Sequence, residues 1–181
     1  MEDLSLHILD VAENGIIAGA SLIRITVEED LEADRLEIVV EDNGRGMDAS
    51  FKARAVDPFV TSRTSRKVGL GLSLFQQSAR EAGGDLKVDS EPGCGTRVTA
   101  WMVHGHIDRK PMGSMVDTVL TLIEGNPGLD FVYRHKKGEK EYLLDTREIR
   151  AELDEIPLNH PRVVGLLKED LLSGLGEVAS G

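Results

Sequence analysis

The sequence predicts an α+β protein with one sizeable domain and a small C-terminal unit. Apolar residues recur at helical spacing over residues 3–18 and 69–82, and every second residue is apolar in short stretches such as 22–28 and 36–40. The dipeptide Lys110-Pro111 interrupts both patterns and marks a break in the chain. We therefore expect four segments: a domain over 1–104, a linker over 105–111, a small α+β unit over 112–175 and a frayed tail over 176–181.

The composition limits the partners and the location. The formal net charge of −11 argues against nucleic acid or a lipid membrane as the main partner, since both are polyanions. The single cysteine excludes an intramolecular disulfide framework and a multi-cysteine metal site within this chain. No apolar run approaches the length of a membrane span, and the acidic start does not resemble a signal peptide. We expect a soluble cytoplasmic protein.

Residues 3–18 form the first predicted helix, with a cap available at Asp3 or Ser5. Its apolar side should face the sheet and contains Leu4, Ile8, Val11, Ala12 and Gly15. His7, Asp10 and Asn14 follow one another at spacings of three and four, so they share a second face. An amphipathic helix explains isolated polar residues without any function, and we expect His7 on the helix surface.

The next stretches predict a β-hairpin that leads into a glycine turn. Residues 22–28 and 36–40 alternate between apolar and polar, and an acidic loop at 29–34 joins them. The second strand ends at residues 42–47, Asp-Asn-Gly-Arg-Gly-Met. Glycines here let the backbone approach a flat ligand closely, although an Asp beside a turn glycine is by itself ordinary turn chemistry.

A basic loop and a second glycine pair follow a short helix that Asp48 can cap. The loop at 60–68 is the most basic stretch of an acidic protein and immediately precedes the glycines, which favours a phosphate lid over a solvated loop. Its cations are Arg63, Arg66 and Lys67. The helix that begins at residues 69–72, Gly-Leu-Gly-Leu, presents free backbone N–H groups to an anion.

The C-terminal third predicts a helix from Met112 to Ile123, a hairpin over 130–144, a capped helix from 145 to 153 and a last helix from Asn159. It contains no catalytic constellation, and we expect it to bind a partner protein or a second copy of the chain. The His104-Gly105-His106 sequence lacks the spacing of a metal site and is interpreted as linker.

Four motifs, in this order, resemble those of a known superfamily. They are residues 10–14 (DVAEN), 42–47 (DNGRGM), 69–72 (GLGL) and 93–96 (GCGT). Together they resemble the nucleotide-binding motifs of the GHKL superfamily, which contains gyrase, Hsp90-type chaperones, histidine kinases and MutL. The resemblance covers roughly the first hundred residues. It implies a Bergerat fold, a two-layer α/β sandwich with helices on one face of a mixed sheet, and it implies ATP and Mg²⁺ as ligands.

The resemblance also implies roles for single residues in binding. Asn14 takes the place of the residue that ligates the magnesium held by the triphosphate. Asp42 would accept a hydrogen bond from the adenine amino group, with Gly44 and Gly46 giving the base close access to the backbone. Thr96 matches the threonine that shares a water with that aspartate.

The expected catalytic and phosphate-binding residues come from the remaining motifs. Asp10 stands where hydrolysing members have a glutamate that activates water, and Glu13 is the rival base. The shorter Asp10 counts against rapid hydrolysis. Gly69, Leu70, Gly71 and Leu72 would cradle the phosphates, with Arg63 and Lys67 reaching them from the lid.

Three functional classes fit this resemblance. A short lid and the Asp57-Pro58-Phe59 sequence, which resembles the phenylalanine motif of histidine kinases, favour a stand-alone kinase that phosphorylates a partner protein. A slow regulatory ATPase is the second class. The third is a non-catalytic nucleotide sensor within a larger complex, for which a redox complex is one setting.

Overall fold

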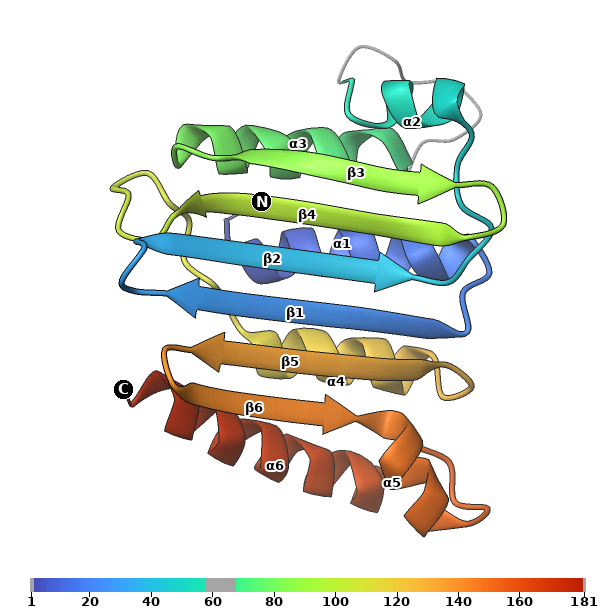
Figure 1. The fold of residues 1–181 in the computed structure, drawn as a ribbon. Helices are drawn as coiled ribbons and strands as arrows, with labels where there is room; N and C mark the ends of the chain where they lie inside the picture. Colours follow the sequence, from blue (N-terminus) through green and yellow to red (C-terminus); the bar gives the residue numbers. More distant parts are fainter. Residues whose placement is uncertain (1, 58–67, 181) are drawn as a thin grey trace.

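The computed structural model describes residues 2–57 and 68–180 and shows one continuous sheet with helices on one of its faces (Figure 1). The six strands lie in the order β3-β4-β2-β1-β5-β6. The β1–β5 pair is parallel and the other four pairs are antiparallel, so the sheet is mixed. This arrangement confirms the predicted α+β two-layer sandwich of the Bergerat type.

Helix α1 (Leu4–Ile17) forms where the sequence predicts it. Asp3 is the N-cap, and its carboxylate accepts a hydrogen bond from the backbone N–H of Leu6 at 3.1 Å. The predicted apolar side is buried against the sheet and the neighbouring helices. His7 is an exception to the prediction, because it is buried and not on the helix surface.

The central strands also follow the alternation in the sequence. They are β1 (Leu22–Asp30), β2 (Arg35–Asp42), β3 (Asp85–Glu91) and β4 (Gly95–Val103). Their inward residues include Ile23, Ile38 and Ala100, which are fully buried in the core shared with α1 and α3 (Val68–Glu81). Asp48 caps the short helix α2 (Ala49–Ala55), as predicted.

The C-terminal third extends the same sheet. It contributes α4 (Met115–Gly125), β5 (Asp130–Lys137), β6 (Lys140–Asp145), α5 (Thr146–Leu153) and α6 (Pro161–Ala179). Strand β5 pairs with the free edge of β1, where Ile25 lies beside Tyr133, and both side chains are buried in one shared core. Pairing satisfies the backbone groups that β1 would otherwise expose, so the predicted small unit packs as a continuation of the first domain.

Three boundaries in this third differ from the prediction. Helix α4 begins at Met115 and not at Met112, because Ser114 caps it by accepting a hydrogen bond from the Asp117 N–H at 3.1 Å. Helix α6 begins at Pro161, with His160 as its cap. The expected frayed tail is helical through Ala179, because Val178 is buried and anchors the last turn of α6.

The predicted linker is held against the first domain by backbone hydrogen bonds. The N–H groups of Leu4 and Ser5, which have no partner within α1, donate to the carbonyls of Pro111 and Met112 at 2.9 and 2.8 Å. At its other end, His104 Nε2 lies 2.7 Å from Glu29 of β1. The linker therefore connects the start of α1 with the C-terminal third. In the described part of the chain no helix is long and apolar enough to cross a membrane.

Candidate functional site

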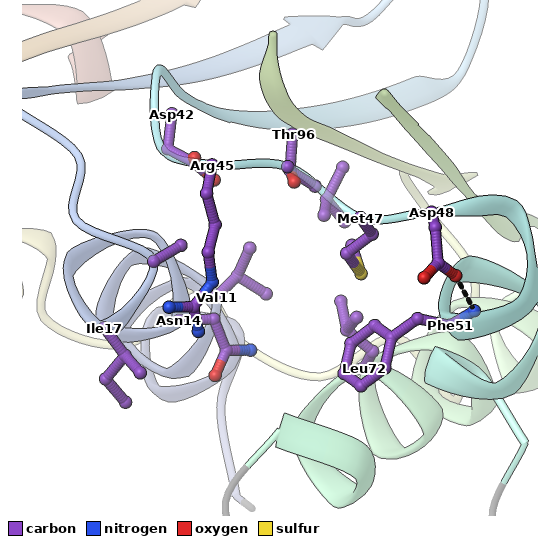
Figure 2. A pocket seen from close by; sticks show the side chains of 13 residues that line it. Val11, Asn14, Ile17, Asp42, Arg45, Met47, Asp48, Phe51, Leu72 and Thr96 are labelled. Carbon is purple, nitrogen blue, oxygen red and sulfur yellow. Dashed lines mark hydrogen bonds between the residues drawn. The ribbon is translucent and has the colours of Figure 1, made fainter. Parts of the chain in front are cut away.

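A cavity of about 230 Å³ lies between the second half of α1, the glycine turn after β2, α2 and the start of α3 (Figure 2). Each of the four motifs therefore contributes residues to the wall of this one cavity. The lining residues are Val11, Asn14, Ile17, Ala18, Asp42, Arg45, Gly46, Met47, Asp48, Phe51, Leu72, Thr96 and Val98. Most of these surfaces are apolar, and a few polar groups converge on them, which is typical of a small-molecule site.

Asp42 supplies the carboxylate of this cavity. It is the last residue of β2, and one of its carboxylate oxygens accepts a hydrogen bond from the Gly44 N–H at 2.8 Å. Burial raises the pKa of Asp42, and the backbone N–H groups of Gly44 and Thr96 oppose the rise. Helix α1 comes close because residue 15 is glycine: a Cβ there would lie 2.7 Å from the Asp42 Cβ.

The glycine turn owes its path to close backbone contacts. Gly46 has a φ of +69°, and a Cβ there would lie 2.0 Å from the Glu91 carbonyl oxygen. A Cβ on Gly44 would lie 2.8 Å from the Ala18 carbonyl oxygen. Between them, the Arg45 N–H donates to the Ala18 carbonyl at 3.0 Å. The turn is thus anchored to the end of α1 and to the end of β3.

Thr96 stands beside Asp42 in the β2–β4 register. Its hydroxyl lies 2.9 Å from that of Ser90, and the Ser90 hydroxyl also accepts from the Met47 N–H at 2.8 Å and donates to the Gly95 carbonyl at 2.9 Å. Ser90 therefore fixes the position of the Thr96 hydroxyl and of the turn together.

Of the three polar residues that share one face of α1, only Asn14 lines the cavity. Asp10 is half-buried and faces the first turns of α3, where a Cβ on Gly71 would lie 3.0 Å from Asp10 Oδ2, and burial raises the pKa of Asp10. Glu13 is exposed. Neither carboxylate is among the lining residues within the described ranges.

The start of α3 supplies the last of the predicted segments. Leu72 lines the cavity, and Gly71 allows the close approach of Asp10. Gly69 and Leu70 form part of the first turn of the α3 backbone. Arg63 and Lys67, the predicted lid cations, lie outside the described residues.

Sequence reasoning missed several residues of this cavity. Figure 2 shows Arg45 extending from the glycine turn toward α1, and Phe51 and Met47 gathered near Leu72. The position of Arg45 between two constrained glycines is a signal that could have found it. The apolar residues of α2 carried no such signal, because a helix of seven residues is too short for a clear period.

Comparisons with known proteins agree with this arrangement. The model of the family described as histidine kinase-, DNA gyrase B-, and HSP90-like ATPase matches residues 2–105. The signal transduction histidine-protein kinase AtoS of Escherichia coli is 33 % identical over 99 residues, which are 54 % of this chain and 16 % of AtoS. The sensor protein kinase FleS of Pseudomonas aeruginosa is 40 % identical over 92 residues, which are 51 % of this chain and 23 % of FleS. The chain thus spans less than a quarter of the length of these curated relatives.

A solved structure extends the likeness in fold. The crystal structure of the N-terminal domain of a DNA repair protein superposes with a TM-score of 0.56 at 17 % identity, covering 80 % of this chain and 53 % of that one. At this identity the likeness concerns the fold alone.

Proposed function

The chain belongs to the histidine kinase-, DNA gyrase B- and HSP90-like ATPase family, and on this premise we propose that it binds Mg-ATP and acts on a partner protein, as a kinase or a slow regulatory ATPase. The observation that carries the proposal is the single cavity that Asp42, Thr96 and Asn14 line together. We also propose that the protein acts in the cytoplasm.

Adenine fits the end of the cavity formed by the glycine turn. Asp42 offers a carboxylate to the exocyclic amino group, and Thr96 stands beside it. The apolar side chains of Met47, Leu72 and Val98 line the cavity and can pack against the faces of a purine ring. A guanine would present a carbonyl oxygen where adenine presents its amino group, and two acceptors would then face each other.

The phosphates would extend toward Asn14 and the start of α3. The amide oxygen of Asn14 suits Mg²⁺, a hard cation that keeps several oxygen ligands from phosphate and water and needs few from the protein. Bound there, Mg²⁺ would neutralise part of the phosphate charge. The free N–H groups at the start of α3 would add to this, and Arg63 and Lys67 are the proposed lid contacts.

Asp10 is the proposed general base. Its raised pKa makes it a better proton acceptor than an exposed aspartate, and its place beside Gly71 lies near the phosphate end of the cavity. Exposed Glu13 remains the rival. The nucleophile, a water or a hydroxyl or imidazole of a partner, would lose its proton to this base as its attacking atom bonds to the γ-phosphorus and the bond to the bridging oxygen of ADP breaks.

A nucleotide sensor is the second candidate function. The observation that favours it is the attachment of the linker to α1 through the Leu4–Pro111 and Ser5–Met112 hydrogen bonds. A nucleotide that shifts α1 would thereby move residues 112–175, which we propose to bind the partner or a second copy in a homodimer. A regulatory subunit of a larger, for instance redox, complex would work in this way.

The fate of the γ-phosphate distinguishes these functions. The protein is incubated with Mg²⁺ and ATP labelled at the γ-phosphate, and the label is then located. Free phosphate that disappears in Asp10→Asn indicates an ATPase, and label on protein indicates a kinase. Bound and intact ATP supports the sensor. Absence of ATP binding by titration calorimetry would refute the proposal as a whole.

A further inference from the structure

Ser90 of β3 is hydrogen-bonded to groups that adjoin the cavity. Its hydroxyl accepts a hydrogen bond from the Met47 N–H at 2.8 Å, donates to the Gly95 carbonyl at 2.9 Å and lies 2.9 Å from the Thr96 hydroxyl. Met47 and Thr96 line the cavity, whereas Ser90 is not one of its lining residues in the described part of the chain. Any effect of Ser90 on a ligand in the cavity therefore passes through these neighbours.

The three contacts of Ser90 fix the direction of each hydrogen bond. A hydroxyl has one hydrogen to donate and two lone pairs that accept. The Gly95 carbonyl can only accept, so it takes the Ser90 hydrogen, and the Met47 N–H uses one lone pair of the Ser90 oxygen. The second lone pair is left for Thr96, which must then donate its own hydrogen. The Thr96 oxygen therefore keeps only lone pairs for any further partner.

Thr96 and Asp42 form a pair of acceptors on the cavity wall. They lie directly opposite each other on β4 and β2, and Figure 2 shows both among the side chains that line the cavity. The Cβ atoms of such opposite residues are roughly 4.5–5.5 Å apart. Two acceptors that bind the two hydrogens of one NH₂ group, each at about 2.9 Å from its nitrogen, are also about 5 Å apart. The pair thus matches both hydrogens of an exocyclic amino group.

We propose that Ser90 is a positioning residue that makes Thr96 a hydrogen-bond acceptor, so that the cavity selects an amino group and rejects a carbonyl oxygen on a purine ring. The inference rests on the proposed binding of ATP. One hydrogen of the adenine amino group would bind Asp42 and the other would bind Thr96. In inosine triphosphate, a carbonyl oxygen replaces the amino group and would face both acceptors. Thr96 could donate to that oxygen only by giving up its hydrogen bond to Ser90.

The test compares the affinities for ATP and inosine triphosphate by titration calorimetry. Ser90→Ala leaves the Thr96 hydroxyl free to rotate and to donate to the carbonyl oxygen of inosine triphosphate. We expect the preference of the parent for ATP to fall by roughly 3- to 10-fold, which corresponds to one neutral hydrogen bond. Ser90→Thr retains a hydroxyl and should keep the preference of the parent. In a Thr96→Val background, Ser90→Ala should not change the preference further, because Ser90 acts through the Thr96 hydroxyl.

A purely structural role for Ser90 predicts that both nucleotides bind more weakly by the same factor. Ser78→Ala is the matched control, because Ser78 is buried in α3, away from the cavity lining, and its hydroxyl has no hydrogen-bond partner among the described residues. It should leave both affinities unchanged. Ser90 also lines a second, polar cavity of about 340 Å³, so water can reach the groups that Ser90→Ala leaves unpaired, and the fold should be retained. Should Ser90→Ala unfold, Ser90→Cys replaces the hydroxyl by a weakly hydrogen-bonding thiol and is measured in the same way.

A second measurement needs no nucleotide. A hydroxyl proton that is held in a hydrogen bond exchanges slowly with water and gives an NMR signal. We expect this signal for Thr96 in the free parent and in Ser90→Thr, and its loss in Ser90→Ala. An unchanged preference for ATP in Ser90→Ala, or a Thr96 signal that does not differ between the two proteins, overturns the inference. Absence of ATP binding by the parent instead refutes the proposed function together with the selectivity, and the NMR comparison then still decides whether Ser90 orients Thr96.

Discussion

Replacing Asp42 by asparagine tests how the cavity recognises adenine. The substitution is nearly isosteric, and the retained side-chain oxygen can still accept the hydrogen bond from the Gly44 N–H that is 2.8 Å long in the parent. The glycine turn should therefore keep its path. The other oxygen becomes an NH₂ group, which would face the amino group of adenine donor to donor.

The expected loss follows from the bond that is removed. A hydrogen bond to a charged group contributes about 1.5–3 kcal/mol, which corresponds to roughly a 10- to 150-fold weaker affinity for ATP. The same carboxylate adds a pH dependence. Burial raises its pKa in the free protein, so protonation should weaken ATP binding at a pH above that expected for an exposed aspartate, and Asp42→Asn should abolish this effect.

Titration calorimetry with ATP and GTP at several pH values measures both effects. Glu41→Gln is the matched control, because Glu41 is the neighbouring residue of β2 and forms an ion pair with Arg97 at 3.0 Å away from the cavity. It should leave the affinity unchanged. Equal affinity of the parent for ATP and GTP, or unchanged ATP affinity in Asp42→Asn with the fold intact, would refute the assigned adenine site.

Three further predictions concern other residues. Asn14→Ala should abolish the Mg²⁺-dependent part of ATP binding in calorimetry while the circular dichroism spectrum stays that of the parent, and an unchanged magnesium dependence would contradict its role. Gly46→Ala should destabilise the fold in urea unfolding by at least about 1–2 kcal/mol, because the backbone is left-handed there, whereas Gly128→Ala, with no neighbour within 4 Å, should be nearly neutral. Glu29, hydrogen-bonded first to His135 and also to His104, has its pKa lowered from 4.5 to about 2. Its stabilisation of about 3 kcal/mol is present above pH 4.5 and is lost as the pH falls toward 2; Glu29→Gln should remove that slope, and an identical slope in both proteins would contradict the assignment.

The predictable part of the fold rests on local patterns. Leu4, Ile8 and Val11 recur at helical spacing and are all buried in α1. Asp48 and Asp145 cap the helices that follow them, because a side-chain oxygen next to free N–H groups is a local arrangement. Such features depend on neighbours a few residues away, and the sequence displays these neighbours directly.

The candidate site was predictable to the extent that its motifs are contiguous. Asn14, Asp42, Gly46, Leu72 and Thr96 were predicted to bind one ligand, and the structure places them around one cavity. The roles of these residues stay predictions. The sequence did not predict that Arg45, Phe51 and Val98 line the cavity. Their positions there depend on how the glycine turn, α2 and β4 pack against one another.

By itself, the sequence determined where most helices and strands lie, the caps at Asp48 and Asp145, and the order of the four motifs, because each depends on the periodicity or the chemistry of adjacent residues. Only the tertiary structure decided that β5 pairs with β1, that the linker caps α1, and that His7 is buried on Phe75. These contacts join residues that are far apart in the chain. The energy of each depends on which surfaces the whole fold leaves free, and no local pattern encodes that choice.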